Sequence, residues 1–529
     1  SMGLASPRPS TAIQAALVDV VLPAGNVAIS MQSGTLAASL LRLAHRLRLG
    51  VSWFVSLGDK ADVSANDLLQ FWEDDDATDV IALYTESLGN PRKFARIARR
   101  VGARRPIVVV RTGAAQVGAG NEALYRETGA IEVPTVTALL DTARVLSSQP
   151  LMDGLRVAVV TNSRSPAVLA TATLEAAGLE PVIEPVAGGW EATADDYGAA
   201  VTTAIADPEV HAVMIVHAPP VEDAVDAPID AIERATAGAA KPAVAVMIGA
   251  VDGPLRPGSA VPVFAFVEPA AAALGRVAAY SRWRALEAAD DPAPPADIDS
   301  PRAGAVIAES IAAGAAVTPT QARELLDAYG IDMPVTVRVP AADAVRAATA
   351  IGYPVAIKAV RRRAGRSTEA GIGLDIGSPD AVEQALAKMA DLLDEDASDV
   401  IVQQMVAPGV DLRIKVLTDE RLGPVISVGL GGIQADVIGD TASRLAPVSA
   451  PAARTLLSGT RAAAALDEGA LDRATDAIVR VAQLASDHPA IVELDLNPVI
   501  VGTDSCTVAD VSVRLDPTAR AEPALRRLE

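Results

Sequence analysis

Short aliphatic runs alternate with helical patterns in the first part of the chain. Asn26 to Ser30 is followed by a helical pattern that reaches Leu49, and Val80 to Tyr84 by one that reaches Arg100. Ile107 to Val110 is a third aliphatic run. Alternating strands and helices with short connections predict a parallel, doubly wound sheet.

A second segment beginning at Leu155 repeats this layout. Arg156 to Thr161 reads as a strand, and Pro166 to Ala177 reads as a helix. Further strands are expected at Ala212 to Val216 and Ala243 to Ile248. We therefore predict an α/β protein that opens with two flavodoxin-like, doubly wound parallel-sheet domains.

The density of proline and acidic residues marks residues 286–303 as a linker, because such a segment cannot build a core. We place the domains at residues 1–150, 151–285 and 304–529. In the third, helices are predicted at Thr320 to Tyr329, Pro379 to Leu393 and Asp472 to Ser486, and strands at Pro334 to Val339, Val355 to Val360, Val400 to Met405, within Leu412 to Leu430, at Ile491 to Leu494 and at Thr507 to Val511.

The amino-acid composition favours an α/β fold and argues against several classes of function. Half of the 529 residues are hydrophobic but only 3% are aromatic, which suits the aliphatic cores of α/β folds. A net charge of −21 argues against nucleic-acid and anionic-membrane binding. With one cysteine, no membrane-length apolar stretch and no signal-peptide pattern, we expect a cytoplasmic protein. Ser1-Met2 is typical of an expression scar, so the natural protein can be longer.

Ser33, Gly34 and Thr35 follow a predicted strand and open a helix. The free N–H groups of a helix N-terminus can hold a phosphate. An ordinary capped helix explains the same three residues, and local sequence does not choose between the two.

Four segments in order resemble one family over about 100 residues. They are Val27 to Leu36, Gly50 to Gly58, Ala61 to Val63 and Leu83 to Ser87. Together they resemble the succinyl-CoA-synthetase-like domain of ADP-forming acyl-CoA synthetases. The resemblance implies that the helix after Ser33-Gly34 binds a phosphohistidine, which a glutamate matching Glu86 orients.

The histidines of that family are missing. Where the family carries Ser-His-Thr-Gly, this chain reads Arg111 to Glu122 without a histidine. The partner phosphate helix of the family begins Thr-Asn-Ala-Gly-Gly, whereas here Asn162, Arg164 and Ser165 occupy the turn. We interpret this as degeneration of the phosphate site, with direct anion binding by Arg164 as the alternative. The second family histidine is absent from the loop Arg361 to Gly373, whose arginines could bind nucleotide phosphate, CoA phosphate or nothing.

Residues 320 to 515 resemble an ATP-grasp domain. By that resemblance Lys358, which ends the run from Gly352, contacts nucleotide phosphates. The nucleotide-binding set would be completed by Gly431 and Gly432 of the run from Gly423, by Arg444 and by Glu493. The residue after the glycines departs from the family, since Ile433-Gln434 replaces its glutamate, while Asp440 and Arg444 match.

The run from Glu493 to Pro498, followed by Asp510, is the best-preserved chemical motif. By the same resemblance, Asn497 and Asp510 would hold Mg²⁺, an ion that oxygen ligands suit, and Glu493 would support them. A surface hairpin carrying acidic residues is the plain alternative. The expected cofactors are therefore ATP and Mg²⁺, with CoA or acyl-CoA as further ligands.

Three functions remain open. The first is a regulatory pseudo-enzyme that binds ATP, acyl-CoA or both; the second is an active acyl-CoA ligase whose relay is non-standard or comes from a partner; the third is an oligomerisation scaffold. The ATP-grasp stretch looks most like the synthetase module of bacterial proteins fused to a GNAT acetyltransferase. A CoA-binding Rossmann domain and an acetyltransferase are therefore expected in a longer chain or a partner, and a homo-oligomer is expected.

Overall fold

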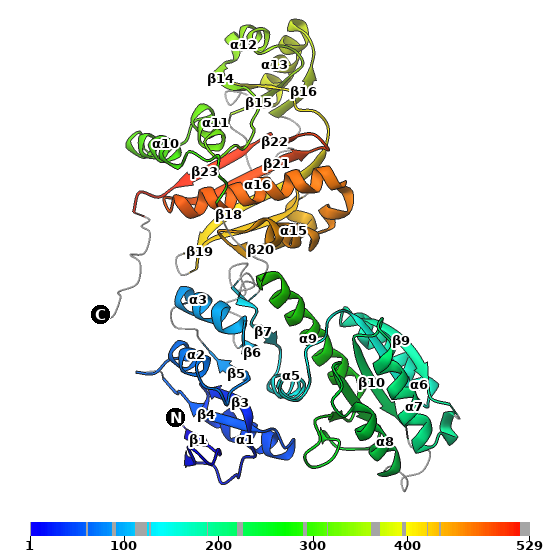
Figure 1. The fold of residues 1–529 in the computed structure, drawn as a ribbon. Helices are drawn as coiled ribbons and strands as arrows, with labels where there is room; N and C mark the ends of the chain where they lie inside the picture. Colours follow the sequence, from blue (N-terminus) through cyan, green and yellow to red (C-terminus); the bar gives the residue numbers. More distant parts are fainter. Residues whose placement is uncertain are drawn as a thin grey trace. The chain divides into compact units, whose positions relative to one another are not determined.

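In the computed structural model, the described residues are 2–59, 62–86, 91–111, 124–125, 128–187, 189–218, 226–288, 294–314, 316–360, 371–393, 398–419, 422–432 and 435–518. The chain divides into two compact units, which we describe separately (Figure 1). Unit 1 contains residues 1–117 and 125–289, and unit 2 contains residues 118–124 and 290–529.

The first sheet of unit 1 is doubly wound. Its strand order is β2-β1-β4-β3-β5-β6-β7, with parallel pairing from β4 to β7. Counted along the chain, the parallel strands run 2-1-3-4-5, which is flavodoxin-like. Its elements are β1 (Gly3–Ser6), β2 (Ile13–Ala16), β3 (Ala24–Met31), α1 (Gly34–Arg46), β4 (Val51–Ser56), α2 (Ala65–Glu73), β5 (Val80–Thr85), α3 (Pro91–Gly102), β6 (Ile107–Arg111), β7 (Ile131–Val133) and α5 (Val136–Ser148).

The second sheet of unit 1 repeats this winding. Its order is β12-β13-β11-β10-β8-β9, and its parallel strands again run 2-1-3-4-5. Its elements are β8 (Arg156–Thr161), α6 (Arg164–Ala176), β9 (Glu180–Pro185), α7 (Ala194–Ala206), β10 (Ala212–His217), α8 (Asp226–Thr236), β11 (Ala243–Met247), β12 (Gly253–Pro254), β13 (Pro262–Phe264) and α9 (Val267–Ala288). The predicted α/β class with two doubly wound sheets is confirmed.

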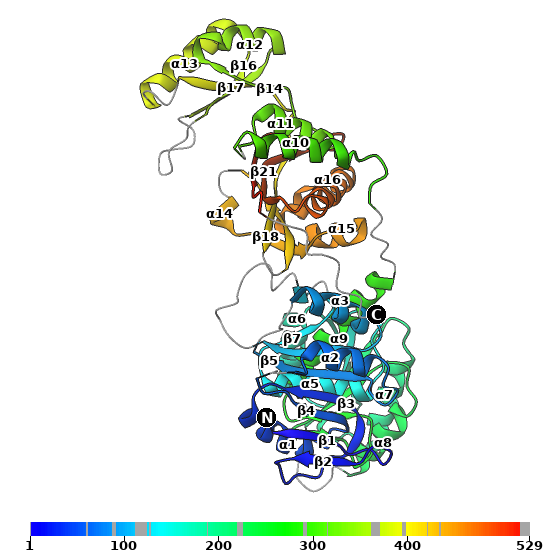
Figure 2. The same cartoon turned by 90° about the vertical axis from the view of Figure 1, so that its left-hand side faces the viewer.

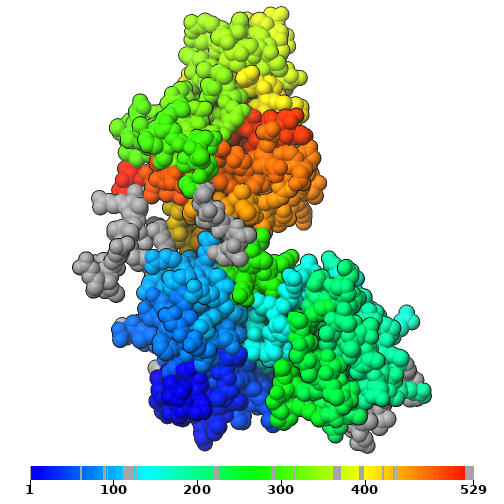
Figure 3. All heavy atoms as spheres, in the orientation of Figure 1, coloured from blue at the N-terminus to red at the C-terminus, as the bar shows by residue number. Residues whose placement is uncertain are grey.

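One hydrophobic core joins the two sheets of unit 1. Helix α9 packs against both α5 and α6, and the buried cluster contains Ile29 of the first sheet, Met214 of the second and Leu274 of α9. Figure 3 shows the two halves of unit 1 as bodies in direct contact. Near the end of α9, the Trp283 ring occupies the space that a side chain at position 129 would need. A Cβ atom on Gly129 would lie only 2.2 Å from this ring. Gly129 therefore has to be glycine.

A buried arginine ties α5 to the second sheet. The Arg144 side chain is 4% exposed, and its guanidinium donates to the carbonyls of Gly253 (3.3 Å) and Val263 (3.0 Å) and to Asp141 (2.9 Å). It also lies 4.4 Å from the centre of the Phe264 ring. Burial raises the pKa of Asp141, and the charge of Arg144 opposes this rise.

Unit 2 contains two antiparallel sheets. The smaller one has the order β14-β17-β15-β16, with helices α12 and α13 on one face (Figure 2). Its elements are β14 (Thr336–Pro340), α12 (Ala344–Ile351), β15 (Val355–Ala359), β16 (Ile372–Ile376), α13 (Pro379–Leu393) and β17 (Asp399–Gln404). Helices α10 (Ser300–Ala312) and α11 (Pro319–Asp327) precede it.

The larger sheet has the order β20-β19-β18-β21-β22, and β23 also pairs with β21. Helices α15 and α16 cover one face of this sheet, and their apolar side chains form one hydrophobic core with those of the sheet. Its elements are β18 (Val410–Asp419), β19 (Gly423–Leu430), α14 (Ala435–Ile438), β20 (Thr441–Leu445), α15 (Ala450–Ser458), α16 (Glu468–Asp487), β21 (Ile491–Val501), β22 (Cys506–Val508) and β23 (Val511–Leu515).

Several predicted boundaries differ from the observed ones. The helix expected to reach Leu49 ends at Arg46, and the strand Ile491 to Leu494 continues to Val501. The expected strand Thr507 to Val511 is two strands separated by Ala509-Asp510. The proposed linker 286–303 overlaps the end of α9 and the start of α10, and the domain boundaries stay a prediction. Within the described ranges, no helix combines the length and apolarity needed to cross a bilayer.

Replacing Arg144 with methionine is expected to destabilise unit 1 by about 3–5 kcal/mol, because the substitution leaves Asp141 buried without the cation that is hydrogen-bonded to it. Trp53, Trp72, Trp190 and Trp283 all belong to unit 1, so tryptophan fluorescence during urea unfolding reports on this unit. The control is Arg156→Met, which removes an exposed pair with Glu209 and should cost under about 1 kcal/mol. Equal losses in the two variants would contradict the assigned role of Arg144.

The buried imidazole of His217 makes unit 1 sensitive to acid. It is 4% exposed, its Nδ1 lies 2.8 Å from Tyr197 Oη, and burial lowers its pKa. The unfolded chain therefore takes up the proton first as pH falls below about 6.5, so the stability that neutral His217 provides above that pH is lost below it.

We expect the urea midpoint followed by tryptophan fluorescence to fall more between about pH 7.5 and pH 5 in the wild type than in His217→Gln. Glutamine cannot take up this proton, whereas the other titrating groups are common to both proteins. Identical pH dependence in the two proteins would show that His217 is not the acid-sensitive group.

Candidate functional site

The first phosphate candidate lies at the switch point of the first sheet, where ligands bind in doubly wound folds. Ser33 caps α1 and accepts from the N–H of Leu36, so Gly34 and Thr35 occupy the first turn. Glu86 follows the adjacent strand β5, and its N–H donates to Gln32 Oε1 (2.9 Å). The structure thus places Glu86 at the same sheet edge as the α1 N-terminus.

At the corresponding edge of the second sheet, more of the polar groups are hydrogen-bonded within the protein. The Asn162 amide donates to the carbonyl of Ala218 (2.8 Å) and accepts from its N–H (3.0 Å), so it holds the ends of β8 and β10 together. The Ser163 N–H donates to Thr161 Oγ1 (3.2 Å), and Pro166 has no N–H to offer. Arg164 is exposed at the first position of α6. This helix N-terminus therefore offers fewer phosphate donors than that of α1.

All four histidines make structural hydrogen bonds. His45 Nδ1 contacts the Val21 carbonyl (2.7 Å), and His211 Nδ1 accepts from the Arg156 N–H (3.2 Å). His217 pairs with Tyr197, and His488 contacts Tyr329. The segments that would carry the family histidines, residues 112–123 and 361–370, lie outside the described residues, as do Ile433-Gln434.

A backbone hydrogen bond joins the two predicted metal ligands. The N–H of Asn497 donates to the Asp510 carbonyl (3.1 Å), at the point where pairing passes from β22 to β23. Asn497 Oδ1 accepts from the N–H of Gly432 (2.7 Å), and Asp510 Oδ1 accepts from that of Val511 (3.1 Å). The predicted glycines, Gly431 and Gly432, therefore lie beside the predicted metal ligands.

The oxygen atoms of Asn497 and Asp510 fit a magnesium ion that is coordinated partly by the protein and partly by phosphate. An amide oxygen accepting one hydrogen bond keeps a second lone pair, and carboxylate and amide oxygens are the ligands that Mg²⁺ takes. Among the described residues, no three histidine, cysteine, aspartate or glutamate side chains are grouped to hold a metal by themselves. Phosphate oxygens and water would have to complete the coordination.

Lys358 lies close to Asp510 although 152 positions separate them in the sequence. It is 7% exposed on β15, and its Nζ donates to the carbonyl of Ala509 (2.7 Å). Lys358 and Asp510 line the same cavity, which has a volume of about 90 Å³ and includes Gln403. The structure thus brings together the predicted phosphate-binding lysine and one of the two predicted metal ligands.

Glu493 belongs to a row of charges on the open face of the large sheet. It pairs with Lys415 (2.8 Å) and Arg514 (3.2 Å), and the hydrogen bond from Lys415 lowers its pKa. Arg413 binds both oxygens of the neighbouring Asp495 (2.9 and 2.6 Å). Sequence reasoning missed Arg413 and Lys415, although their alternation with Leu412 and Ile414 is the signal of a half-buried strand.

The register separates Arg444 from this row. Arg444 pairs with Ile426, a core residue on the face that α16 covers, whereas its neighbour Ser443 pairs with Ser427, which in turn pairs with Lys415. Arg444 is 8% exposed. Its position on the covered face favours a structural role, and its assignment to the nucleotide site stays a prediction.

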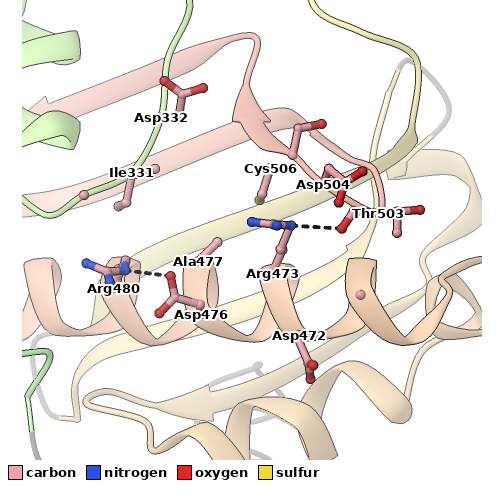
Figure 4. Close-up of a pocket in the computed structure, with 13 residues that line it drawn as sticks. Ile331, Asp332, Asp472, Arg473, Asp476, Ala477, Arg480, Thr503, Asp504 and Cys506 are labelled. Carbon is pink, nitrogen blue, oxygen red and sulfur yellow. Dashed lines mark hydrogen bonds and ion pairs between the residues drawn. The ribbon is translucent and has the colours of Figure 1, made fainter.

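A larger cavity of about 650 Å³ lies elsewhere in unit 2, between α16 and the turn that joins β21 to β22 (Figure 4). Arg473 of α16 lines it and donates to the Thr503 carbonyl (2.9 Å), while Arg480 donates to Asp476 (2.7 Å). Burial raises the pKa of the Cys506 thiol to about 12. None of the predicted site residues lines this cavity.

Comparison with known protein families finds one matching domain in each unit. Residues 24–146 match the succinyl-CoA ligase like flavodoxin domain, and residues 311–515 match the ATP-grasp domain. The predicted ATP-grasp fold of the third domain is therefore confirmed.

Curated relatives align over most of the chain. The ADP-forming acetate–CoA ligase I of Archaeoglobus fulgidus is 28% identical, over 92% of this chain and 77% of its own length. The ADP-forming 4-hydroxybutyrate–CoA ligase of Nitrosopumilus maritimus is 26% identical, over 97% and 81%.

A solved structure of acetyl-coenzyme A synthetase 1 from Ca. Korarchaeum cryptofilum, in complex with phosphate and ADP, aligns with a TM-score of 0.48 and 25% identity, over 54% of this chain and 71% of that one. The two domain matches and the long curated alignments agree on one family. The chain belongs to the superfamily of ADP-forming acyl-CoA synthetases that have an ATP-grasp domain.

Proposed function

We propose that this chain is a synthetase-like module that binds Mg·ATP in unit 2 and acts as a regulatory pseudo-enzyme without a phosphohistidine relay. The observation that carries the nucleotide site is the shared cavity of Lys358 and Asp510, with Asn497 hydrogen-bonded to Asp510. A lysine ammonium and two oxygen ligands are the groups needed to hold phosphates and their magnesium ion. When bound, the ion would neutralise phosphate charge.

Loss of the relay is supported by the histidine inventory. The family reaction passes a phosphoryl group through an imidazole, which acts as the covalent nucleophile. The sequence has no histidine at either family position, and the four histidines it has are engaged elsewhere. The N-terminus of α6 agrees with this proposal, because the Asn162 amide and the Ser163 N–H are bound within the protein and Pro166 has no N–H.

An active acyl-CoA ligase is the second candidate. It is favoured by alignment with acetate–CoA and 4-hydroxybutyrate–CoA ligases over at least 92% of this chain. This candidate requires a nucleophile that is non-standard or comes from a partner. In either case acyl-CoA is the proposed second ligand, and a CoA-binding Rossmann domain, an acetyltransferase and a second copy of this chain are the proposed partners.

Mg·ATP is expected to bind to the wild type, and Lys358→Met is expected to weaken binding roughly 10- to 100-fold, because a hydrogen bond to a charged group is lost. Asn497→Ala and Asp510→Ala should weaken binding only when magnesium is present. Calorimetric titration of the wild type and of each variant, with and without magnesium, measures these affinities. The matched control is Lys388→Met, an exposed lysine on α13 of the same small sheet, which should bind as the wild type does. Failure of the wild type to bind Mg·ATP would rule out the proposed nucleotide site.

No acid-dependent ADP release is expected when acetate, CoA and Mg·ATP are added to the protein, because no imidazole is placed to carry the phosphoryl group. A coupled assay for ADP, with and without acetate, separates this reaction from background ATP hydrolysis. Steady acetate-dependent ADP release that is abolished by Asp510→Ala would overturn the pseudo-enzyme proposal in favour of the active ligase.

A further inference from the structure

The carbonyl oxygen of Ala509 is held by two side chains from the small sheet. Lys358 Nζ donates to it at 2.7 Å and Gln403 Nε2 donates at 3.1 Å. All three residues are buried, with exposures of 7% for Lys358, 3% for Gln403 and 8% for Ala509. A carbonyl oxygen has two lone pairs, so these two donors satisfy its capacity. Ala509 directly precedes Asp510, the proposed metal ligand.

A second hydrogen bond fixes the orientation of Gln403. Its Nε2 also donates to Thr336 Oγ1 (2.9 Å), while the Thr336 hydroxyl donates its own proton to the Pro334 carbonyl (2.8 Å). Thr336 must therefore accept from Gln403, which determines which end of the amide carries the nitrogen. Both N–H groups of Gln403 are thus committed, one within the small sheet and one to Ala509.

This arrangement has a consequence for nucleotide binding. If Lys358 contacts phosphates, as the proposed function requires, its Nζ has to leave the Ala509 carbonyl or share itself with the ligand. A buried carbonyl that loses all its donors carries the full cost of desolvation. Gln403 remains as a donor when Lys358 moves, so the carbonyl stays paired and the Ala509-Asp510 segment keeps its place.

We infer that Gln403 is a positioning residue of the nucleotide site, holding the Ala509 carbonyl, and with it the Asp510 carboxylate, while Lys358 turns to the phosphates. The inference rests on the proposed function for its ligand. The hydrogen bonds from Lys358 and Gln403 to the Ala509 carbonyl are present in the protein without nucleotide, so they can be tested separately.

The binding test compares Gln403→Met with the wild type by calorimetric titration of ATP with and without magnesium. Methionine keeps the length of the side chain but cannot donate. Mg·ATP binding is expected to weaken roughly five- to tenfold, and the magnesium concentration giving half-maximal binding at fixed ATP is expected to rise. Binding of ATP in EDTA should be unchanged. The matched control is Gln404→Met, an exposed glutamine next along β17, which should stay within about twofold of wild type.

Equal weakening with and without magnesium would overturn the inference, since it would mean general damage rather than misplacement of Asp510. So would unchanged Mg·ATP binding in Gln403→Met.

The nucleotide-free test is a double-mutant cycle with Lys358→Met and Gln403→Met, followed by calorimetric unfolding. All four tryptophans lie in unit 1, so a transition seen by calorimetry but not by tryptophan fluorescence belongs to unit 2. Each single variant leaves Ala509 with one donor, and the double variant leaves it with none. The double variant is therefore expected to lose more stability than the sum of the two single losses.

Additive losses in this cycle would overturn the shared-acceptor geometry whether or not ATP binds. A non-additive cycle in a protein that binds no Mg·ATP would instead retain the geometry and remove the proposed function. The two failures are therefore distinguishable.

Discussion

Proline in the middle of a sheet is the constraint on which the candidate metal site depends. Pro498 lies in β21, between β18 on one side and β22 and β23 on the other, and it has no N–H to donate. Such a residue is tolerated in a central strand only where the ladder is interrupted. On one side the register shifts between Leu412 and Ile414 of β18, and on the other Ala509-Asp510 lies outside β22 and β23, although the Ala509 N–H still donates to the Pro498 carbonyl (3.0 Å).

The irregular backbone brings the chemical groups together. The Asn497 side-chain amide accepts from Gly432, and the half-buried Asp510 lies next to it, with its carbonyl accepting from the Asn497 N–H. The neighbouring glycine is equally constrained, since a Cβ on Gly431 would lie 2.4 Å from the Leu412 carbonyl. The predicted metal ligands therefore lie where the backbone is irregular.

The sequence predicted the parts of this structure that follow from aliphatic runs. Strands β5, β10 and β11 are buried at every position, and fully buried parallel strands are recognisable as uninterrupted apolar segments. It did not predict the break at Ala509-Asp510, because Thr507 to Val511 contains no glycine or proline to mark one. Nor could local sequence place Arg444 on the covered face or find Gln403, since both positions are decided by pairing with distant strands.

The residues of the candidate site carry unequal weight as signs of function. Gly431 is demanded by the close approach of the backbone in this sheet, so a protein with this fold but no ligand would have reason to keep it. Lys358 and Gln403 are different, because they are polar side chains buried among Val317, Met333, Ile401 and Val513 at the boundary of two sheets. Apolar residues would fill that boundary without the cost of desolvating an ammonium group and an amide. The charge of Lys358 is therefore the feature of this boundary that a bound phosphate would explain, whereas the neutral Gln403 already finds both of its hydrogen-bond partners within the protein.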